Sequence, residues 1–383
     1  MYKRTIANKV IQALDNNQIA IIYGTRQVGK TTLTKQIADY LVESKVMLQK
    51  DILQVSGDDI EIREVLSSQK TNTLLDFVRN AKLFIIDEAQ RIENIDVNLK
   101  IIYDNLPELK IIATGSSSFE LANKINEPLT GRNNKFLLTP FSFVELTEHE
   151  RIFDIKSNLN KILKYGTYPK IYALVDNEQK KSNLAYLTTD YLYKDILEWE
   201  SIQKSSKLTK ILEYLSLNIG GIVSYNDIAT KLEISSKTVE KYIDLLEKAF
   251  VIFHLRAYST NKGNELTRSF KIYFWDLGIR NSLIRNFGDL HLRTDTGGMW
   301  ENYCVAERMK RNQNLGLNIN YYFWRNYDQN EVDFIEDRDG KLFGFEFKFD
   351  KSTMAKGSYN FTKQYDNSTL ELVNKDNFDN FLG

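Results

Sequence analysis

Cysteine and histidine are scarce in this chain of 383 residues, and each scarcity excludes a class of site. Cys304 is the only cysteine, so an intramolecular disulfide and a cysteine-built zinc centre are excluded, and a reducing, cytoplasmic setting is expected. The only histidines, His149, His254 and His291, argue against a histidine-built metal centre. Any metal must therefore bind carboxylates, which suits Mg²⁺ or Mn²⁺.

Long apolar runs and net charge are also lacking. No run reaches the roughly 18 apolar residues that a membrane helix needs, so we expect no membrane partner. Residues 1–17 predict an amphipathic helix and a turn, without the features of a signal peptide. Lys plus Arg total 51, as do Asp plus Glu, which argues against coating nucleic acid by bulk charge. The balanced total charge does not exclude a local basic groove that binds nucleic acid.

The length predicts two to four structural units. Residues 1–150 alternate short apolar strands with helical stretches, which is typical of an α/β unit with a parallel sheet. Residues 151–204 are predicted to be mostly helical. Residues 205–262 contain three helical stretches and a strand, a pattern that suggests a winged helix-turn-helix. Residues 263–383 then form a small α/β unit.

The third helical stretch of the 205–262 unit gives little support for DNA reading. A recognition helix usually presents net positive charge, but residues 235–250 carry three basic and three acidic side chains, so packing or partner binding is the alternative. Residues 256–293 hold seven basic and three acidic residues, a net charge of +4. That excess fits phosphate contact and a solvated face about equally well.

A phosphate-binding loop follows the predicted strand IAIIY. Gly24, Gly29, Lys30 and Thr31 match G-x-x-x-x-G-K-[ST] in a strand–loop–helix context, which makes a chance match unlikely to explain the pattern. Backbone N–H groups of such a loop bind phosphate, the lysine reaches the β- and γ-phosphates, and the threonine holds Mg²⁺. The predicted nucleotide-binding residues of this stretch are Gly24, Thr25, Arg26, Gln27, Val28, Gly29, Lys30, Thr31 and Thr32.

Polar residues after the next predicted strands complete a hydrolytic site. Asp87 and Glu88 follow LFII; the first would contact Mg²⁺ and the second would polarise water, although acids are also favoured at a helix N-terminus. Thr114 and Ser116 share one strand face, where a hydroxyl could sense the γ-phosphate or cap a helix. Arg132 follows a glycine and is either a γ-phosphate arginine or a solvated one.

The motifs GTRQVGKT, FIIDEAQR, ATGSSS, LTGR and TPFSFVEL together resemble a subgroup of prokaryotic AAA+-type P-loop ATPases. Thr25 replaces a proline that is frequent in that subgroup. The resemblance implies that residues 151–204 form a lid, that Ser116 is a sensor and that Arg132 is an arginine finger. It also implies a C-terminal domain of restriction-endonuclease-like fold with a poorly defined role.

The stretch EVDFIEDRDGKLFGFEFKF carries the pattern of a nuclease-like centre. The predicted elements of the last unit, in the order helix, three strands, helix and strand, follow the order of the PD-(D/E)xK core, and the positions of that pattern match Asp333, Glu346, Lys348 and Glu301. Clustered carboxylates would bind Mg²⁺ or Mn²⁺ and the lysine would stabilise negative charge. The alternation of aromatic residues with Glu346 and Lys348, taken by itself, is equally explained by an amphipathic hairpin. One strand face is expected to be aromatic, with Phe343, Phe345, Phe347 and Phe349.

Two functions follow from these expectations. The first is an Mg²⁺-dependent ATPase coupled to a nuclease-like domain that acts on DNA, with Glu88, Arg132, Asp333, Glu346 and Lys348 as catalytic residues. The second is an ATP-driven switch whose silent C-terminal domain binds a protein or nucleic acid. A homo-oligomer, with Arg132 acting on a neighbouring subunit, stays open.

Overall fold

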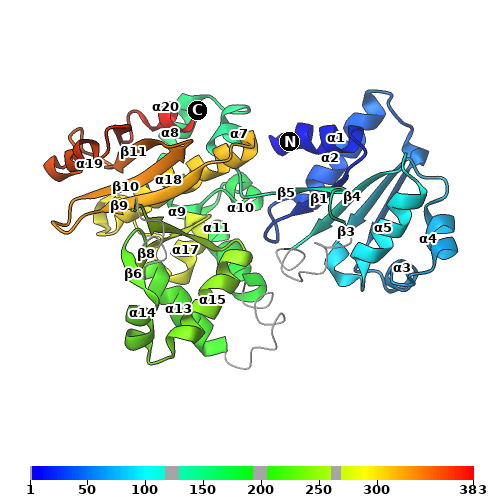
Figure 1. The fold of residues 1–383 in the computed structure, drawn as a ribbon, viewed down its shortest axis with the longest axis horizontal. Helices are drawn as coiled ribbons and strands as arrows, with labels where there is room; N and C mark the ends of the chain where they lie inside the picture. Colours follow the sequence, from blue (N-terminus) through cyan, green and yellow to red (C-terminus); the bar gives the residue numbers. More distant parts are fainter. Residues whose placement is uncertain (1, 117–128, 193–204, 260–268) are drawn as a thin grey trace. The chain divides into compact units, whose positions relative to one another are not determined.

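The computed structural model describes residues 2–116, 129–192, 205–259 and 269–383, and it divides the chain into two compact units (Figure 1). Unit 1 ends at Thr139, and unit 2 runs from Pro140 to Gly383. Among the described helices, none is both long and apolar enough to cross a membrane.

Unit 1 is built on a sheet of five strands in the order β2-β3-β4-β1-β5, all parallel. The predicted parallel α/β sheet is therefore confirmed. The carboxyl ends of parallel strands meet at one edge, where open α/β sheets bind ligands. The strands are β1 (Ile19–Tyr23), β2 (Ile52–Ser56), β3 (Leu83–Asp87), β4 (Lys110–Gly115) and β5 (Asn133–Leu137).

Helices cover both faces of this sheet (Figure 1). Helices α3, α4 and α5 pack apolar side chains against the face that presents Ile21, Phe84 and Ile86, while α1 and α2 lie on the opposite face. Because β1, β3 and β4 are covered on both sides, their residues are almost uniformly apolar. The helical elements are α1 (Ile6–Asp15), α2 (Lys30–Glu43), η1 (Gln49–Asp51), α3 (Ile60–Leu66), α4 (Thr71–Val78), η2 (Ala89–Arg91) and α5 (Ile95–Asn105).

Unit 2 contains one mixed sheet of seven strands in the order β12-β11-β10-β9-β7-β8-β6. The pairs β7–β9 and β11–β12 are parallel, and the others are antiparallel. The strands are β6 (Ile222–Ser224), β7 (Ile252–Ala257), β8 (Ser269–Phe274), β9 (Asn320–Arg325), β10 (Glu331–Arg338), β11 (Lys341–Phe347) and β12 (Ser368–Val373).

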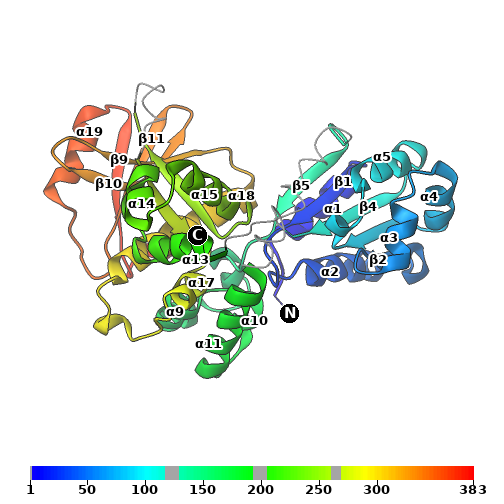
Figure 2. The ribbon, with the colours of Figure 1, turned by 90° about the horizontal axis from the view of Figure 1, so that it is seen from below.

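The helices of unit 2 form three groups along the chain. Helix α14 contacts β6, α15 contacts β7 and α19 contacts β12, so these helices lie beside the sheet (Figure 2). The first group is α7 (Phe143–Thr147), α8 (Ile152–Ser157), α9 (Leu159–Tyr165), α10 (Pro169–Ala173), α11 (Asn177–Tyr186) and η3 (Leu187–Leu192). The second is α13 (Ser205–Leu217), α14 (Tyr225–Leu232) and α15 (Ser236–Lys248). The third is α17 (Leu277–Leu283), η4 (Leu290–Leu292), α18 (Thr296–Leu315), η5 (Lys356–Ser358), α19 (Tyr359–Gln364) and α20 (Phe378–Leu382).

The boundaries between units differ from the expected ones. The first unit ends at Thr139 and not at 150, because α7 is held in unit 2, where the Phe143 N–H donates to Glu307 Oε2 at 2.6 Å. The sheet also continues across the expected 262/263 boundary, since β8 pairs with β6 and β7, and β7 pairs with β9. Residues 205–262 and 263–383 therefore share one sheet. Their winged-helix and nuclease-like assignments stay predictions.

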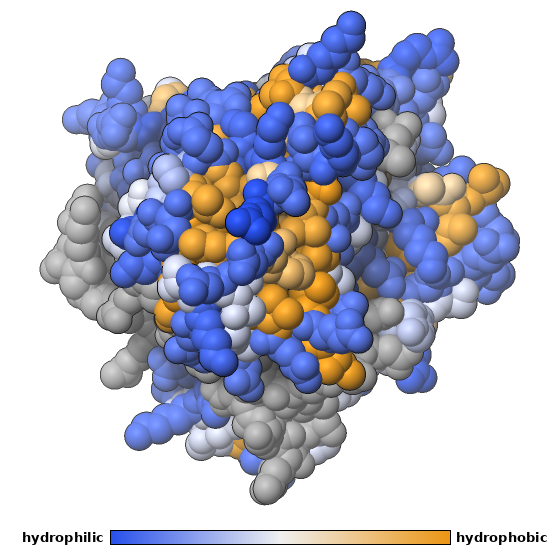
Figure 3. Space-filling view, turned by 90° about the vertical axis from the view of Figure 1, so that its right-hand side faces the viewer, coloured by the Kyte–Doolittle hydropathy of each residue, from blue (hydrophilic) through white to orange (hydrophobic). Residues whose placement is uncertain are grey.

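An apolar band marks the surface of unit 1. Figure 3 looks onto this side of the molecule, where hydrophobic side chains gather between hydrophilic ones. Surface areas of this kind are typical of protein contact sites. The exposed large apolar side chains described in unit 1 are Tyr40, Val46, Leu48 and Ile60.

Candidate active site and a buried ion cluster

The loop of residues 24–29 joins β1 to α2 in a conformation that only glycine allows at key points. Gly24 and Gly29 have φ values of 154° and 97°. A side chain at Gly24 would lie 2.2 Å from the Leu138 carbonyl oxygen, which excludes every other residue there. The loop therefore ends at the N-terminus of α2, where free backbone N–H groups favour an anion.

Lys30 is folded over this loop. Its ammonium donates to the carbonyl oxygens of Gly24 at 2.8 Å and Thr25 at 3.1 Å, and only 6% of the residue is exposed. The positive charge is thus held inside the curve of the loop. This is the arrangement that phosphate oxygens require in the predicted role of Lys30.

Thr31 and Asp87 meet beside the loop. The Thr31 hydroxyl donates to Asp87 Oδ2 at 2.6 Å, and the Thr114 hydroxyl donates to Asp87 Oδ1. Asp87 ends β3 and Thr114 lies near the end of β4, so the sheet edge brings the three together. A hydroxyl and a carboxylate next to an anion-binding loop are the hard oxygen ligands that suit Mg²⁺.

Glu88 follows Asp87 with a left-handed backbone, at φ 50°. Its carboxylate accepts a hydrogen bond from the Gln90 side chain at 2.5 Å. Left-handed non-glycine residues occur often at functional sites, which agrees with the predicted role of Glu88 toward water. Ser116 lies just past β4 and is buried. Its sensor role stays a prediction; on β4 itself, the Thr114 hydroxyl donates to Asp87.

Arg132 lies at the other edge of the sheet. Its carbonyl accepts from the Ile19 N–H at the start of β1, while the phosphate loop follows the end of β1. The strand length separates the two by about 15 Å. The Arg132 guanidinium is paired with Asp104, with Nε 2.8 Å from Oδ1. This geometry gives no support to a finger that acts on the ATP of its own chain, and the role of Arg132 on its own or a neighbouring chain stays a prediction.

In unit 2 the four predicted residues of the nuclease-like centre converge. Lys348 lies 3.1 Å from Glu346 Oε1 and 4.0 Å from Asp333 Oδ2. Asp333 also accepts from the Phe347 N–H at 2.9 Å, and its other oxygen lies 3.5 Å from the lysine that contacts Glu301. The aromatic face is buried at Phe345 and Phe347, as predicted, and Phe343 and Phe349 are only partly covered.

A lysine that the sequence did not single out lies at the middle of these acids. Lys271 Nζ is 2.8 Å from Glu301 Oε1, 2.6 Å from Glu331 Oε1 and 3.5 Å from Asp333 Oδ1, and its side chain is 1% exposed. Tyr273, two residues on and so on the same face of β8, donates to Glu301 at 2.7 Å. A lysine within an otherwise apolar strand was the sequence signal that could have identified Lys271 as a buried, paired residue.

The described residues give no support to the predicted metal site at Glu301, Asp333 and Glu346, which stays a prediction. Within the described ranges, no group of three or more His, Cys, Asp or Glu side chains is arranged to hold a metal ion. The physical reason is that the Lys271 ammonium already supplies the positive charge that the carboxylates need. Glu346 is bound elsewhere as well, because it accepts from Ser358 Oγ at 2.5 Å.

The pKa values follow from this burial and charge. Burial alone would lower the pKa of Lys271, but Glu301, Asp333 and Glu331 raise it well above its usual range, so Lys271 is charged. Burial raises the pKa of Glu301 to about 7, against the lowering effect of Lys271 and with a further raise from Asp333. Burial is the largest cause of the raised pKa of Glu301, because it disfavours the charged form, and the nearby Asp333 carboxylate adds to it.

Much of the positive charge at 256–293 is internal. Arg280 donates to the Ser216 carbonyl at 2.7 Å and pairs with Asp295, which also pairs with Arg293 at 2.6 Å. Lys271 is enclosed in the acid cluster. These charges do not form a phosphate-binding face. Lys262 and Arg268 lie outside the described residues. In α15, Lys248 pairs with Asp244 at 2.8 Å, which leaves little excess charge there.

Three families match consecutive parts of the chain. Residues 16–147 match an AAA domain, residues 156–290 match a domain of unknown function (DUF8612), and residues 296–378 match another (DUF4143). The first match contains the phosphate loop, Asp87 and Glu88. The match to an AAA domain therefore covers the predicted ATP site of unit 1 and extends eight residues into unit 2.

Relatives of this chain span most of its length. An uncharacterized protein of Haemophilus influenzae is 26% identical over 85% of this chain and 81% of its own. One of Methanocaldococcus jannaschii is 27% identical over 87% of this chain and 75% of its own. Among solved structures, the Aeropyrum pernix ORC1 protein in complex with DNA matches with a TM-score of 0.32 and 12% identity, over 73% of this chain and 91% of that one. Domain III of Thermotoga maritima DnaA, a replication initiation protein, matches with a TM-score of 0.30 and 14% identity, over 48% of this chain and 90% of that one.

Proposed function

We propose that this protein is an Mg²⁺-dependent ATPase that works as a switch, in which the nucleotide state of unit 1 controls how unit 2 engages a partner. The observation that carries the ATPase is the pair of contacts in the AAA-type domain: Lys30 inside the phosphate loop, and Thr31 on Asp87. Unit 2 has no catalytic role in this proposal, because the buried Lys271 ammonium already lies among the acids of its nuclease-like centre.

Each residue of the ATP site has a role that its contacts support. The backbone N–H groups of residues 24–32 bind the phosphates, and Lys30 reaches the β- and γ-phosphates. Thr31 and Asp87 would hold Mg²⁺, which when bound neutralises phosphate charge. Thr114 fixes the orientation of Asp87, and Glu88 polarises the attacking water.

The partner is proposed to be a protein. The basic residues of 256–293 that are described are largely paired inside unit 2, and α15 has balanced charges. The apolar band on unit 1 is a further surface suited to protein contact. DNA binding, and a homo-oligomer in which Arg132 reaches a neighbouring chain, are the alternatives.

The ATP site is tested with Lys30→Ala and, as a control, Lys35→Ala on the exposed side of the same helix. Loss of charged hydrogen bonds to phosphate should weaken ATP binding by roughly tenfold or more, since each contributes about 1.5–3 kcal/mol. Binding is measured with a fluorescent ATP analogue. Wild-type affinity and turnover in folded Lys30→Ala would refute the site.

Glu88→Gln separates hydrolysis from binding. Because Glu88 acts on water, the variant should bind ATP normally and hydrolyse it about 10²–10⁴-fold more slowly. Exposed Glu93→Gln is the matched control. Reduced binding with unchanged turnover per bound ATP would contradict the role of Glu88.

The proposal that the nuclease-like centre of unit 2 has no catalytic role is tested by titrating the full chain with Mn²⁺ and by incubating it with DNA and RNA, with and without ATP. We expect no cleavage and no Mn²⁺ binding that depends on Asp333. Cleavage that is lost in Asp333→Asn would restore the nuclease hypothesis and overturn the switch.

A further inference from the structure

Arg4 joins the phosphate loop to the last residue of unit 1. It precedes α1 and is 6% exposed. One guanidinium nitrogen donates to the Val28 carbonyl at 2.8 Å, and the other donates to the Thr139 carbonyl at 2.5 Å. The side chain thus connects a loop residue to the point where the chain leaves unit 1.

The same exit segment contacts the other end of the loop. The Leu138 N–H donates to the Tyr23 carbonyl at 2.7 Å, which extends the pairing of β1 and β5. The Leu138 carbonyl fills the space that a side chain at Gly24 would take. Residues 138–139 therefore contact both ends of the phosphate loop. Leu138 packs directly against Gly24 at its start, and Arg4 links Thr139 to Val28 near its end.

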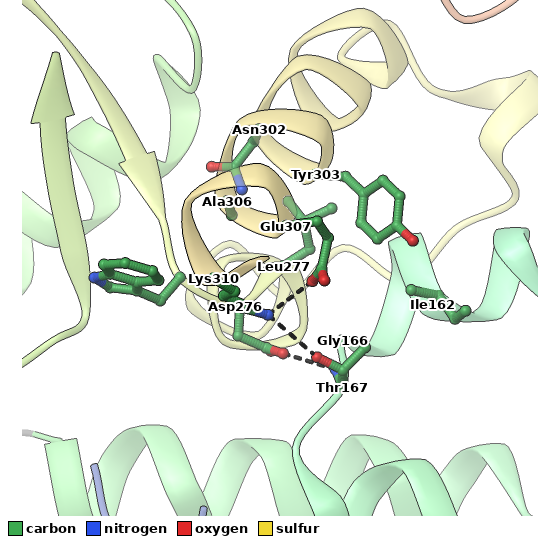
Figure 4. Close-up of a pocket in the computed structure, with 11 residues that line it drawn as sticks. Ile162, Gly166, Thr167, Asp276, Leu277, Asn302, Tyr303, Ala306, Glu307 and Lys310 are labelled. Atoms are coloured by element: carbon green, nitrogen blue, oxygen red, sulfur yellow. Dashed lines mark hydrogen bonds and ion pairs between the residues drawn. The ribbon is translucent and has the colours of Figure 1, made fainter. Parts of the chain in front are cut away.

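Two residues later the chain is held in unit 2. The Phe141 N–H donates to the Thr167 carbonyl at 3.0 Å, and the Phe141 carbonyl lies 3.4 Å from Lys310 Nζ. The Phe143 N–H donates to Glu307, whose other oxygen pairs with Lys310 at 2.7 Å. Figure 4 shows Glu307, Lys310 and Thr167 turned toward one another.

The space among these side chains is too small for a ligand. The cavity measures about 10 Å³, room for a single water at most. Asp276 closes another side by accepting from the Thr167 N–H at 2.7 Å. The polar side chains here act on the chain itself, and they fix the start of unit 2.

We propose that Arg4 is a positioning residue of the ATP site, and that residues 138–143 transmit the state of the phosphate loop to unit 2. Pro140 lies between the two anchored stretches, and its fixed φ removes one of the backbone rotations that separate Thr139 from Phe141. This inference rests on the proposed function, because it needs ATP to bind the loop.

The test uses the full chain with Arg4→Gln, and Lys3→Gln as the control at the exposed neighbouring position. Loss of the link between loop and exit should raise KM for ATP about tenfold while kcat changes much less. Amide hydrogen exchange, with and without ATP, then reports on residues 141–147 and 165–170. In the wild type and in Lys3→Gln, ATP should change exchange there. In Arg4→Gln saturated with ATP, that change should be lost.

Glu307→Gln tests the other anchor. It lies outside the ATP site, so ATP affinity and turnover should match the wild type, while the ATP-induced change in exchange at 165–170 should fall by at least half because the pairing with Lys310 is weakened. If Arg4→Gln does not fold, Arg4→Lys and Glu307→Gln together decide.

The two proposals fail in different ways. A wild-type protein that binds no fluorescent ATP analogue refutes the proposed function. A wild type that binds ATP, but whose exchange at 141–147 and 165–170 is the same with and without it, refutes this inference alone. So does an Arg4→Gln variant that keeps the full ATP-induced change.

Discussion

Among single side chains, Lys271 determines the charge of the acid cluster in unit 2. It is enclosed by Glu301 of α18 and by Glu331 and Asp333 of β10. Removing one partner of a buried ion pair leaves an uncompensated charge, which costs more than the pair contributes. The sequence predicted that removing Asp333 would relieve repulsion; with Lys271 present, removal should instead destabilise unit 2.

Lys271→Met is expected to lower the free energy of unfolding by about 3–5 kcal/mol, because three acids lose their buried cation. Urea unfolding measures this, with exposed Lys351→Met as the control. Mn²⁺ should restore part of the loss in Lys271→Met and have no effect on this unit in the wild type. Equal stability of Lys271→Met and Lys351→Met would contradict the role of Lys271.

Glu301 should give unit 2 a distinct pH dependence. Its pKa is raised from 4.5 to about 7, so between these values the folded state holds a proton that the unfolded state has released. Stability from this group is complete below about pH 4.5 and falls as pH rises toward 7, by roughly 3 kcal/mol in total. Glu301→Gln cannot titrate and should flatten this fall. Parallel stability curves of the two proteins between pH 5 and 8 would argue against it.

Arg132→Ala is expected to leave the turnover of isolated chains nearly unchanged, since the side chain pairs with Asp104 away from the phosphate loop. A half-exposed pair of this kind contributes about 0–1 kcal/mol to stability. Turnover measured against protein concentration tests this. A large loss that appears only at high concentration would show that Arg132 acts on a neighbouring chain.

Whole helices and strands were predictable where one pattern extends over several residues. Strands β1, β3 and β4 are covered on both faces and read as apolar runs. Helices α14 and α15 begin at serine caps, since Ser224 accepts from the Asp227 N–H and Ser235 from the Thr238 N–H. Strand β2 was missed because this edge strand is only partly buried and has no clear alternation.

The ATP site was predictable because its motif is local, whereas the acid cluster depends on distant pairing. Lys271 meets Glu301 across 30 positions and Asp333 across 62. No short pattern connects β8 to β10. The lysine therefore stayed hidden until β7 and β9 were seen to join the two parts of the sheet.

The turn between α9 and α10 depends on Gly166. Its φ is 72°, and a side chain there would lie 2.1 Å from Asp276 Oδ1. Gly166→Ala should displace the carboxylate that accepts from the Thr167 N–H, and destabilise unit 2 by about 1–3 kcal/mol or more. Thermal unfolding measures this. Exposed Gly297→Ala, which has open space, is the control.

For the molecule as a whole, the seven-stranded sheet predicts that unit 2 folds as one body. A fragment of residues 291–383 lacks Lys271 and the strands β7, β8 and β6 that continue the sheet beyond β9, so it should be unfolded or aggregated on its own. A fragment of residues 140–383 should fold. Circular dichroism and urea unfolding compare the two. A cooperative transition of the shorter fragment would contradict this prediction.

Because Lys271 is buried in the acid cluster, this cluster and the ATP site obtain their positive charge from different sources. The cation proposed for the ATP site comes from solution, so its occupancy follows the magnesium content of the surroundings and a chelator can remove it. The cation of unit 2 is encoded in the chain and made with it. Starvation for metal would therefore empty the proposed Mg²⁺ site and leave the acid cluster with its lysine, so the two centres of the described residues should respond differently to metal.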